Sequence, residues 1–182
     1  MKDVYIEDGE TELTIGYVSV ISNKHADAGL FCLCPLETLY LGRQIKVKIN
    51  NLVSTDTNPP FKGISTLKSL TIGSNVKIIG NKAFYKCSSL TNVTIPHSVT
   101  SLGIDAFREC TALTDVIIGN GVTAIRNYAF KNCSLANIIC ESKTPATLEN
   151  AAFEGVDFTS AILKVPAGTM AVYGSKVVKM KL

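Results

Sequence analysis

The sequence is poor in the residues on which most enzymes depend. It contains no tryptophan and only two histidines, His25 and His97, and His97 is expected to face solvent at a repeat turn. The patterns G-x-S-x-G and H-E-x-x-H, which are typical of hydrolases and zinc proteases, are missing, as is an acidic calcium loop. No pair of groups suited to acid–base or nucleophilic chemistry recurs in one unit. We therefore expect no enzyme activity, no metal and no cofactor.

Charge excess and long apolar runs are also scarce. Eighteen basic and fifteen acidic residues leave a net charge of +3, spread along the chain except for a lysine group in KVVKMKL. This balance argues against nucleic acid as a partner. No stretch approaches the roughly 18 apolar residues of a membrane span, and MKDVYIEDGE lacks the apolar region of a signal peptide. We expect no direct membrane insertion, and any signal sequence lies outside this chain.

What the sequence does contain is a repeat of 23 residues. Each repeat carries an Ala-Phe pair, and Phe61 lies one period before the first pair. A leucine follows most of these phenylalanines after six residues, but after Phe130 it comes one residue early, at Leu135. An insertion in KTPATL restores the register, which indicates that every coil has the same circumference. The pairs are Ala83-Phe84, Ala106-Phe107, Ala129-Phe130 and Ala152-Phe153.

Each leucine opens a segment that predicts a short strand. LKSLTI, LTNVTI, LTDVII and LANIIC share alternating, largely β-branched residues, which is typical of strands with one buried face. A turn follows, and then a second inward-facing pair with the spacing V-x-x-[IL]. The segment from Ala83 to Cys87 is spaced like one helical turn, with Asn81 placed to cap it.

The N-terminal third keeps this register less cleanly. Leu39 corresponds to Leu70, but the two are eight residues further apart than one repeat, and we expect the extra residues within KVKINNLVSTDTNPP. The first strand is predicted in ELTIG, residues 12–16. We predict one domain over residues 1–182, with irregular coils at 1–60, regular coils at 61–157 and a closing segment at 158–182.

Repeats of this length predict a solenoid. A single unit cannot bury its own apolar face, whereas stacked coils place leucine on leucine and phenylalanine on phenylalanine, with strands roughly 4.8 Å apart. We predict a right-handed, curved stack of about six coils. A parallel β-sheet forms one face, and short helical turns and extended segments form the other.

The run LTNVTIPHSVTSLGIDAFRECTALTDVIIG resembles the leucine-rich repeat of BspA-like surface proteins, known from Bacteroides, related bacteria and some mucosal protists. CPLETLYLGR and LKVPAGTMAVYGS resemble that family's irregular coils and closing segment. The resemblance implies a leucine-rich-repeat solenoid that is secreted or displayed on a cell surface. It also implies binding or adhesion to an extracellular protein or glycan, such as a host matrix protein. The alternative is a structural spacer or stalk of a larger surface protein, with no ligand of its own.

Cysteine recurs at one place in four coils, where other coils have isoleucine or valine. This exchange indicates a buried position in which cysteine behaves as a small hydrophobe, so packed free thiols are the main interpretation. A disulfide between Cys87 and Cys110 of neighbouring coils stays open as an alternative. A zinc site is disfavoured, because Cys32-Leu-Cys34 lacks the spacing of a zinc knuckle. The recurring cysteines are Cys34, Cys87, Cys110 and Cys133.

A binding site is expected on the exposed face of the sheet, where stacked strands align their side chains into columns. Strand propensity alone also explains many of these residues. Tyr40 and Arg43 are the predicted anchors, since Tyr and Arg dominate binding hot spots. Thr71, Asn92, Thr94, Asp115 and Lys164 complete the predicted ligand-binding set. One column reads Thr14, Tyr40, Thr71, Thr94, Ile117, Ile139 and Lys164, and the next reads Thr38, Ser69, Asn92, Asp115 and Asn137.

Overall fold

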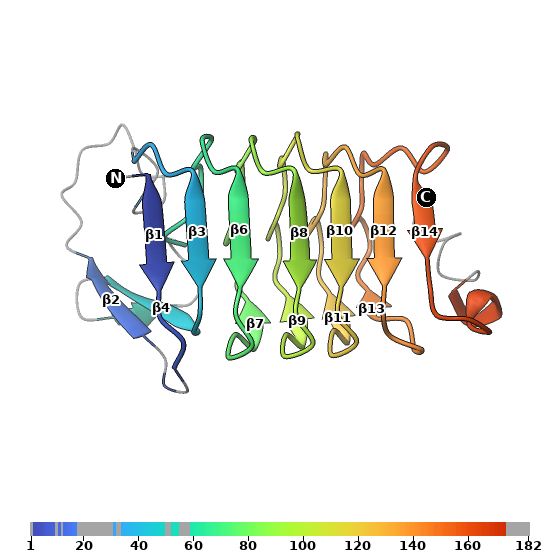
Figure 1. The fold of residues 1–182 in the computed structure, drawn as a ribbon, viewed down its shortest axis with the longest axis horizontal. Coiled ribbons are helices and arrows are strands. Elements are labelled where there is room, and N and C mark those ends of the chain that lie inside the picture. The colour runs from blue at the N-terminus through green and yellow to red at the C-terminus, as the bar shows by residue number, and fades with distance from the viewer. Residues whose placement is uncertain are drawn as a thin grey trace.

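The chain forms a stack of coils, and one strand of each coil lies in a main row of strands side by side (Figure 1). The computed structural model describes residues 2–9, 11, 13–17, 31, 34–49, 52–54 and 59–173. All paired neighbours in the main row are parallel, and β6 and β8 adjoin where its two hydrogen-bonded sheets meet. The predicted leucine-rich-repeat solenoid is thereby confirmed. The row comprises β1 (Asp3–Ile6), β3 (Thr38–Leu41), β6 (Ser69–Ile72), β8 (Asn92–Ile95), β10 (Asp115–Ile118), β12 (Asn137–Cys140) and β14 (Ile162–Lys164).

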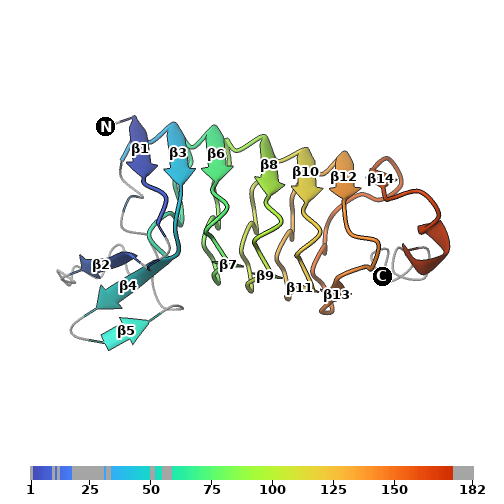
Figure 2. The same ribbon diagram turned by 60° about the horizontal axis from the view of Figure 1, so that its bottom comes forward.

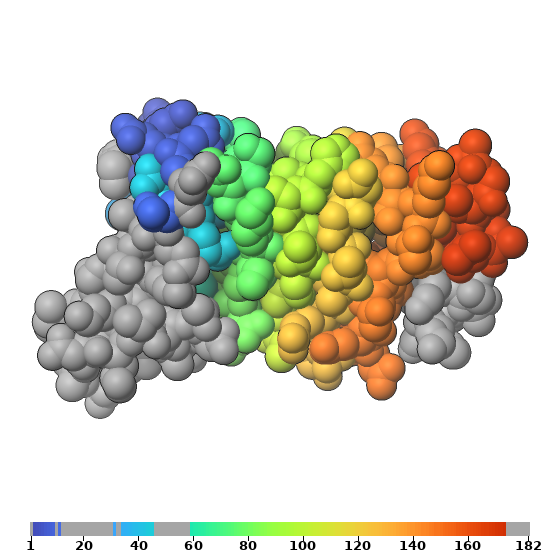
Figure 3. Space-filling view, turned by 90° about the horizontal axis from the view of Figure 1, so that it is seen from below, coloured from blue at the N-terminus to red at the C-terminus, as the bar shows by residue number. Residues whose placement is uncertain are grey.

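A second row of very short parallel strands follows the turn after the main row. In the first three of these strands, one residue points outward and the other, which is the second member of the inward-facing pair of its coil, points into the core. Seen from below, the successive coils form adjoining bands (Figure 3). The strands of this second row are β7 (Ile78–Ile79), β9 (Ser101–Leu102), β11 (Ala124–Ile125) and β13 (Thr147–Leu148).

A small separate sheet stands at the N-terminal end, away from the main row (Figure 2). It consists of β2 (Leu13–Tyr17), which pairs in parallel with β4 (Ile45–Ile49), and β5 (Leu52–Ser54), which pairs antiparallel with β4. Strands β4 and β5 fall in the segment predicted to hold the extra residues, which confirms that prediction. The prediction that residues 12–16 form the first strand of the stack was wrong, because this segment pairs with β4 and β1 leads the main row.

The core contains a ladder of phenylalanine side chains. Five successive pairs of phenylalanine rings stack in nearly parallel planes, with centroids 5.1 to 5.9 Å apart and interplanar angles of 5 to 16°. Phe158 closes the ladder edge-on against Phe153, at 6.0 Å and 67°. The ladder runs through Phe31, Phe61, Phe84, Phe107, Phe130 and Phe153.

The Ala-Phe segment is not the helical turn that its spacing predicts. It is a pair of turns in which seven non-glycine residues of the described chain have φ between 56 and 63°, while Gly63 and Gly155 share one of the two series. In this conformation the amide N–H groups point to the following coil. Those of Lys82, Phe84 and Lys86 donate to the carbonyls of the next coil over 2.8 to 2.9 Å. These bonds between coils alternate with bonds inside each turn, in which the amide N–H groups of Ala83, Tyr85 and Cys87 donate to carbonyls three residues earlier.

The predicted cap by Asn81 is wrong for the same reason. Its Oδ1 accepts a hydrogen bond from the amide N–H of Ile104 in the following coil, at 2.8 Å. The side chain therefore joins two coils instead of starting a helix in its own.

We predict that Phe107→Ala lowers the free energy of unfolding by about 3 to 5 kcal/mol, because it opens a cavity in the ladder. Phe107 is fully buried, and its ring centroid lies 5.3 Å from that of Phe84 and 5.5 Å from that of Phe130. Urea unfolding followed by circular dichroism measures the change. Ile78→Ala is the control, because that side chain is 50% exposed, and its loss should change stability by no more than about 0.5 kcal/mol. Equal effects would contradict the ladder.

Glycine should be tolerated far better at Lys82 than at Lys77. Lys82 has a φ of 56°, a conformation that costs an ordinary residue about 1 to 2 kcal/mol and glycine nothing. Both substitutions raise the conformational entropy of the unfolded chain by the same amount, but only the backbone at Lys82 is left-handed. Lys82→Gly is therefore expected to be more stable than Lys77→Gly by about 1 kcal/mol. Thermal melts compare the two exposed positions. Equal destabilisation would contradict the left-handed turn.

Candidate binding site

The exposed side of the main row, the strand face, carries two aligned columns of side chains. The ladder register confirms both columns from their second coil onward within each of the two hydrogen-bonded sheets, and β6 adjoins β8 where the sheets meet. The place predicted for Thr14 belongs to Tyr5, which lies opposite Tyr40. The second column gains Asp3 at one end and Ile162 at the other. In strand order the first column is Tyr5, Tyr40, Thr71, Thr94, Ile117, Ile139 and Lys164, and the second is Asp3, Thr38, Ser69, Asn92, Asp115, Asn137 and Ile162.

The N-terminal end of the strand face is an aromatic pair. The rings of Tyr5 and Tyr40 stack with centroids 4.4 Å apart and an interplanar angle of 9°. The hydroxyl of Tyr40 donates to Oδ2 of Asp8 at 2.8 Å. This hydrogen bond, followed by burial, raises the pKa of Tyr40 to about 12. Tyr40 is therefore held in place by its own chain, whereas Tyr5 is 66% exposed.

Arg43, the second predicted anchor, is engaged within the chain. Its Nε donates to the carbonyl of Glu7 at 2.8 Å, and one terminal amino group donates to the carbonyl of Asp8 at 2.9 Å. The guanidinium lies against Gly9, where an added Cβ would collide with it. Arg43 thus fixes the loop after β1, and through that loop it positions Asp8 beside Tyr40.

The middle of the strand face is polar and internally bonded. Asp115 accepts hydrogen bonds from the hydroxyl of Thr114 at 2.6 Å and the side-chain amide of Asn137 at 2.7 Å, and these bonds lower its pKa. The side-chain amide of Asn92 donates to the hydroxyl of Thr91 at 3.1 Å. Thr71 and Thr94 are exposed in the column beside them.

The C-terminal end of the strand face is more apolar. Ile117 and Ile139 are half-buried, Ile162 is 55% exposed, and the exposed Lys164 stands opposite Ile139. The seven predicted ligand-binding residues therefore lie on or beside one surface, but they do not converge on a single point.

One carboxylate joins three coils at the start of their strands. Glu37 accepts from the ammonium groups of Lys2 and Lys68, each at 2.9 Å. Hydrogen bonds from Lys68 and Lys2 hold the pKa of Glu37 at about 2. Both lysines next to the aromatic end of the face are thus already paired.

The part of the chain that the structure describes contains no group of three His, Cys, Asp or Glu side chains placed to hold a metal ion. His97 lies at the predicted exposed turn, with its side chain 64% exposed, and its Nδ1 accepts from the amide N–H of Asn120 at 3.2 Å. The predictions for His25, Cys32 and the C-terminal lysine group lie outside the described residues. Among the described residues no helix is long and apolar enough to cross a membrane.

The cysteine column consists of free, packed thiols, as predicted. The thiols of Cys87, Cys110 and Cys133 donate to the backbone carbonyls of Phe61, Phe84 and Phe107, over 3.1 to 3.3 Å. Burial raises the pKa of Cys87 and Cys133 to about 12 and that of Cys110 well above its usual value. The position thus does more than fill space, because each thiol supplies a donor that isoleucine or valine lacks.

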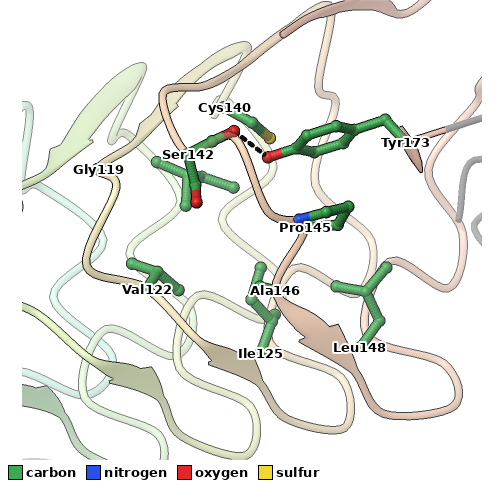
Figure 4. Close-up of a pocket in the computed structure, with 10 residues that line it drawn as sticks. Gly119, Val122, Ile125, Cys140, Ser142, Pro145, Ala146, Leu148 and Tyr173 are labelled. Atoms are coloured by element: carbon green, nitrogen blue, oxygen red, sulfur yellow. Dashed lines mark hydrogen bonds between the residues drawn. The ribbon is translucent and has the colours of Figure 1, made fainter. Parts of the chain in front are cut away.

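A small apolar pocket lies under the C-terminal segment (Figure 4). Cys140, Pro145 and Leu148 line part of it, and its volume of about 20 Å³ leaves room for roughly one water molecule. The hydroxyl of Tyr173 donates to the carbonyl of Ser142 at 2.7 Å and closes one side. Burial, the main cause, raises the pKa of Tyr173 to about 12. The pocket marks where the closing segment packs, and it is too small for an organic ligand.

Sequence reasoning missed Tyr5 and Asp8 on the strand face. The signal was present, because Val4 and Ile6 alternate with outward residues in the same way as Leu39 and Leu41 in the next coil. The first strand of the stack was predicted in ELTIG instead, because the β-branched pattern of that segment is stronger.

The chain resembles known proteins in two of three comparisons. The family described as BspA type leucine-rich repeat region matches residues 30–160 in six copies. A solved leucine-rich repeat protein from Bacteroides ovatus is similar with a TM-score of 0.55 and 22% sequence identity, over 91% of this chain and 42% of that one. The chain thus spans less than half the length of that protein. No curated protein matches the sequence.

The buried thiols should resist alkylation. Only a thiolate is nucleophilic, and burial raises the pKa of Cys87 and Cys133 to about 12 and that of Cys140 to about 11. At pH 8.5 we expect iodoacetamide to label these three and Cys110 at least about tenfold more slowly in the native protein than in urea, as measured by peptide mass spectrometry. Cys34, which is half-buried, should react first among the five described thiols. Equal native and unfolded rates at Cys110 would contradict the packing.

Proposed function

Because the chain belongs to the BspA-type leucine-rich repeat family, we propose that it is a binding module whose strand face recognises an extracellular protein. Leucine-rich repeat domains generally mediate contacts between proteins, and this family is typically associated with cell surfaces. We assign the module to the secreted or surface-displayed proteins, and we assign it no catalytic residue.

The proposal rests on the alignment of side chains along the strand face. Parallel pairing places side chains of successive coils in columns, so that an extended partner meets one continuous surface. Tyr40, Thr71 and Thr94 stand in one column, and Asn92 and Asp115 stand beside them. The face offers an aromatic end, a polar middle and an isoleucine-rich end, which suits a protein partner with mixed chemistry. Arg43 takes part by holding the loop that carries Asp8.

The test is binding of the purified chain to immobilised matrix proteins, mucins and host glycans. The variant Tyr40→Ala, Thr71→Ala, Thr94→Ala removes one tyrosine and two threonines from the strand face. We expect it to weaken saturable binding to a protein by at least about tenfold, because the loss of one tyrosine anchor alone can cost that much.

The matched control removes the same residue types from other faces, with Tyr85→Ala, Thr100→Ala and Thr123→Ala. Both variants are compared after thermal melts establish that they are folded. Equal loss in both variants would contradict a site on the strand face. Absence of binding by the unaltered chain would favour the alternative, a structural spacer within a larger surface protein.

A further inference from the structure

The tyrosine pair on the strand face differs from the other tyrosines of the coils in what covers its rings. Away from the strand face, Tyr85 is covered by three cations of the same chain, Lys62, Lys86 and Arg108, at 5.2 to 5.7 Å from the ring centroid. Tyr128 is covered by Arg108 at 5.8 Å and Lys131 at 4.7 Å. Among the described residues, no cation lies over Tyr5 or Tyr40.

The pair is also rigid before any partner arrives. One face of Tyr5 packs on Tyr40 at 4.4 Å, the hydroxyl of Tyr40 is bonded to Asp8, and Arg43 fixes the loop that carries Asp8. Most of Tyr5 nevertheless remains open, with 66% of the residue exposed. A ligand that stacks on Tyr5 would therefore order little that is not already ordered, which favours affinity.

The charges around the pair favour a cation. Asp3 stands two residues before Tyr5 on the same face of β1, and Asp8 lies at the hydroxyl end of Tyr40. The nearby cations are engaged, Lys2 and Lys68 with Glu37, and Arg43 with two backbone carbonyls. Among the described residues at this end of the face, four carboxylates (Asp3, Glu7, Asp8, Glu37) outnumber three cations (Lys2, Arg43, Lys68) by one.

We infer that Tyr5, Tyr40 and Asp8 form a recognition site for a basic side chain, lysine or arginine, of the protein partner. The cation lies over the open face of Tyr5, where the ring attracts it, and Asp8 supplies the opposite charge. The site does for a partner what Tyr85 and Tyr128 do for cations of their own chain. The inference rests on the proposed function, since it names what the partner must bring to one end of the strand face.

The test follows the ring resonances of Tyr5 by NMR while an acetylated, amidated Gly-Arg-Gly peptide is added to the full chain. The neutral peptide with citrulline in place of arginine is the matched probe, and methyl glycosides test for a sugar instead. We expect saturable shifts with the arginine peptide only. Asp8→Asn, which can still accept from Tyr40, should weaken binding about two- to fivefold, and so should 0.5 M salt. Tyr85→Leu should change nothing.

Equal shifts with the citrulline peptide, shifts with a glycoside alone, or no shift at Tyr5 would each overturn the inference. So would arginine binding that Asp8→Asn leaves unchanged. The panel experiment separates this failure from failure of the proposed function. If the strand-face variant loses protein binding while the arginine peptide leaves Tyr5 unmoved, only the basic-residue site is wrong; if the panel also shows no binding, both are wrong.

Discussion

The spacing between coils is the constraint on which the rest of the structure depends. Backbone hydrogen bonds join neighbouring coils within the two sheets of the main row, in the second row and in the left-handed segment. Parallel strands set that spacing at roughly 4.8 Å, which is close to the separation at which flat aromatic rings stack. A phenylalanine in one coil therefore meets a phenylalanine in the next with little adjustment, and the same holds for the leucines and valines of the core.

This constraint also explains why the backbone adopts unfavourable conformations at certain positions. Residues such as Lys82 and Glu109 adopt positive φ, which disfavours any side chain. The neighbouring coil compensates, because the twisted backbone presents its N–H groups to carbonyls that would otherwise lack a donor. The buried thiols add bonds between coils, since the thiol of Cys110 donates to the carbonyl of Phe84, which also accepts from the amide N–H of Cys87 in its own coil.

The repeating features could be predicted from the sequence, because residues one repeat apart become neighbours when the coils stack. The 23-residue period, the buried face of each strand and the alignment from Tyr40 to Lys164 all followed from spacing. Features that depend on one contact between residues far apart in the sequence could not be predicted. For example, no sequence pattern indicates which backbone carbonyls accept hydrogen bonds from Arg43. The left-handed turns were missed because lysine, aspartate and tyrosine stand at those positions, where glycine would have been the usual signal. Tyr5 was missed because two short alternating segments competed for one place in the stack.

The left-handed segment gives the solenoid a direction. In the coils of Phe84 and Phe107, the N–H groups at both left-handed positions and at the intervening phenylalanine donate to the following coil, as with Phe107 donating to Ala129 and Glu109 donating to Lys131. The two ends of this array are consequently not chemically equivalent, since one presents acceptors and the other presents donors. A duplicated coil can be inserted anywhere and still match both neighbours, provided that it keeps its orientation. Whatever segment terminates the array must supply oxygen atoms at the C-terminal end and amide hydrogens at the other, so the two caps of such a protein cannot be exchanged.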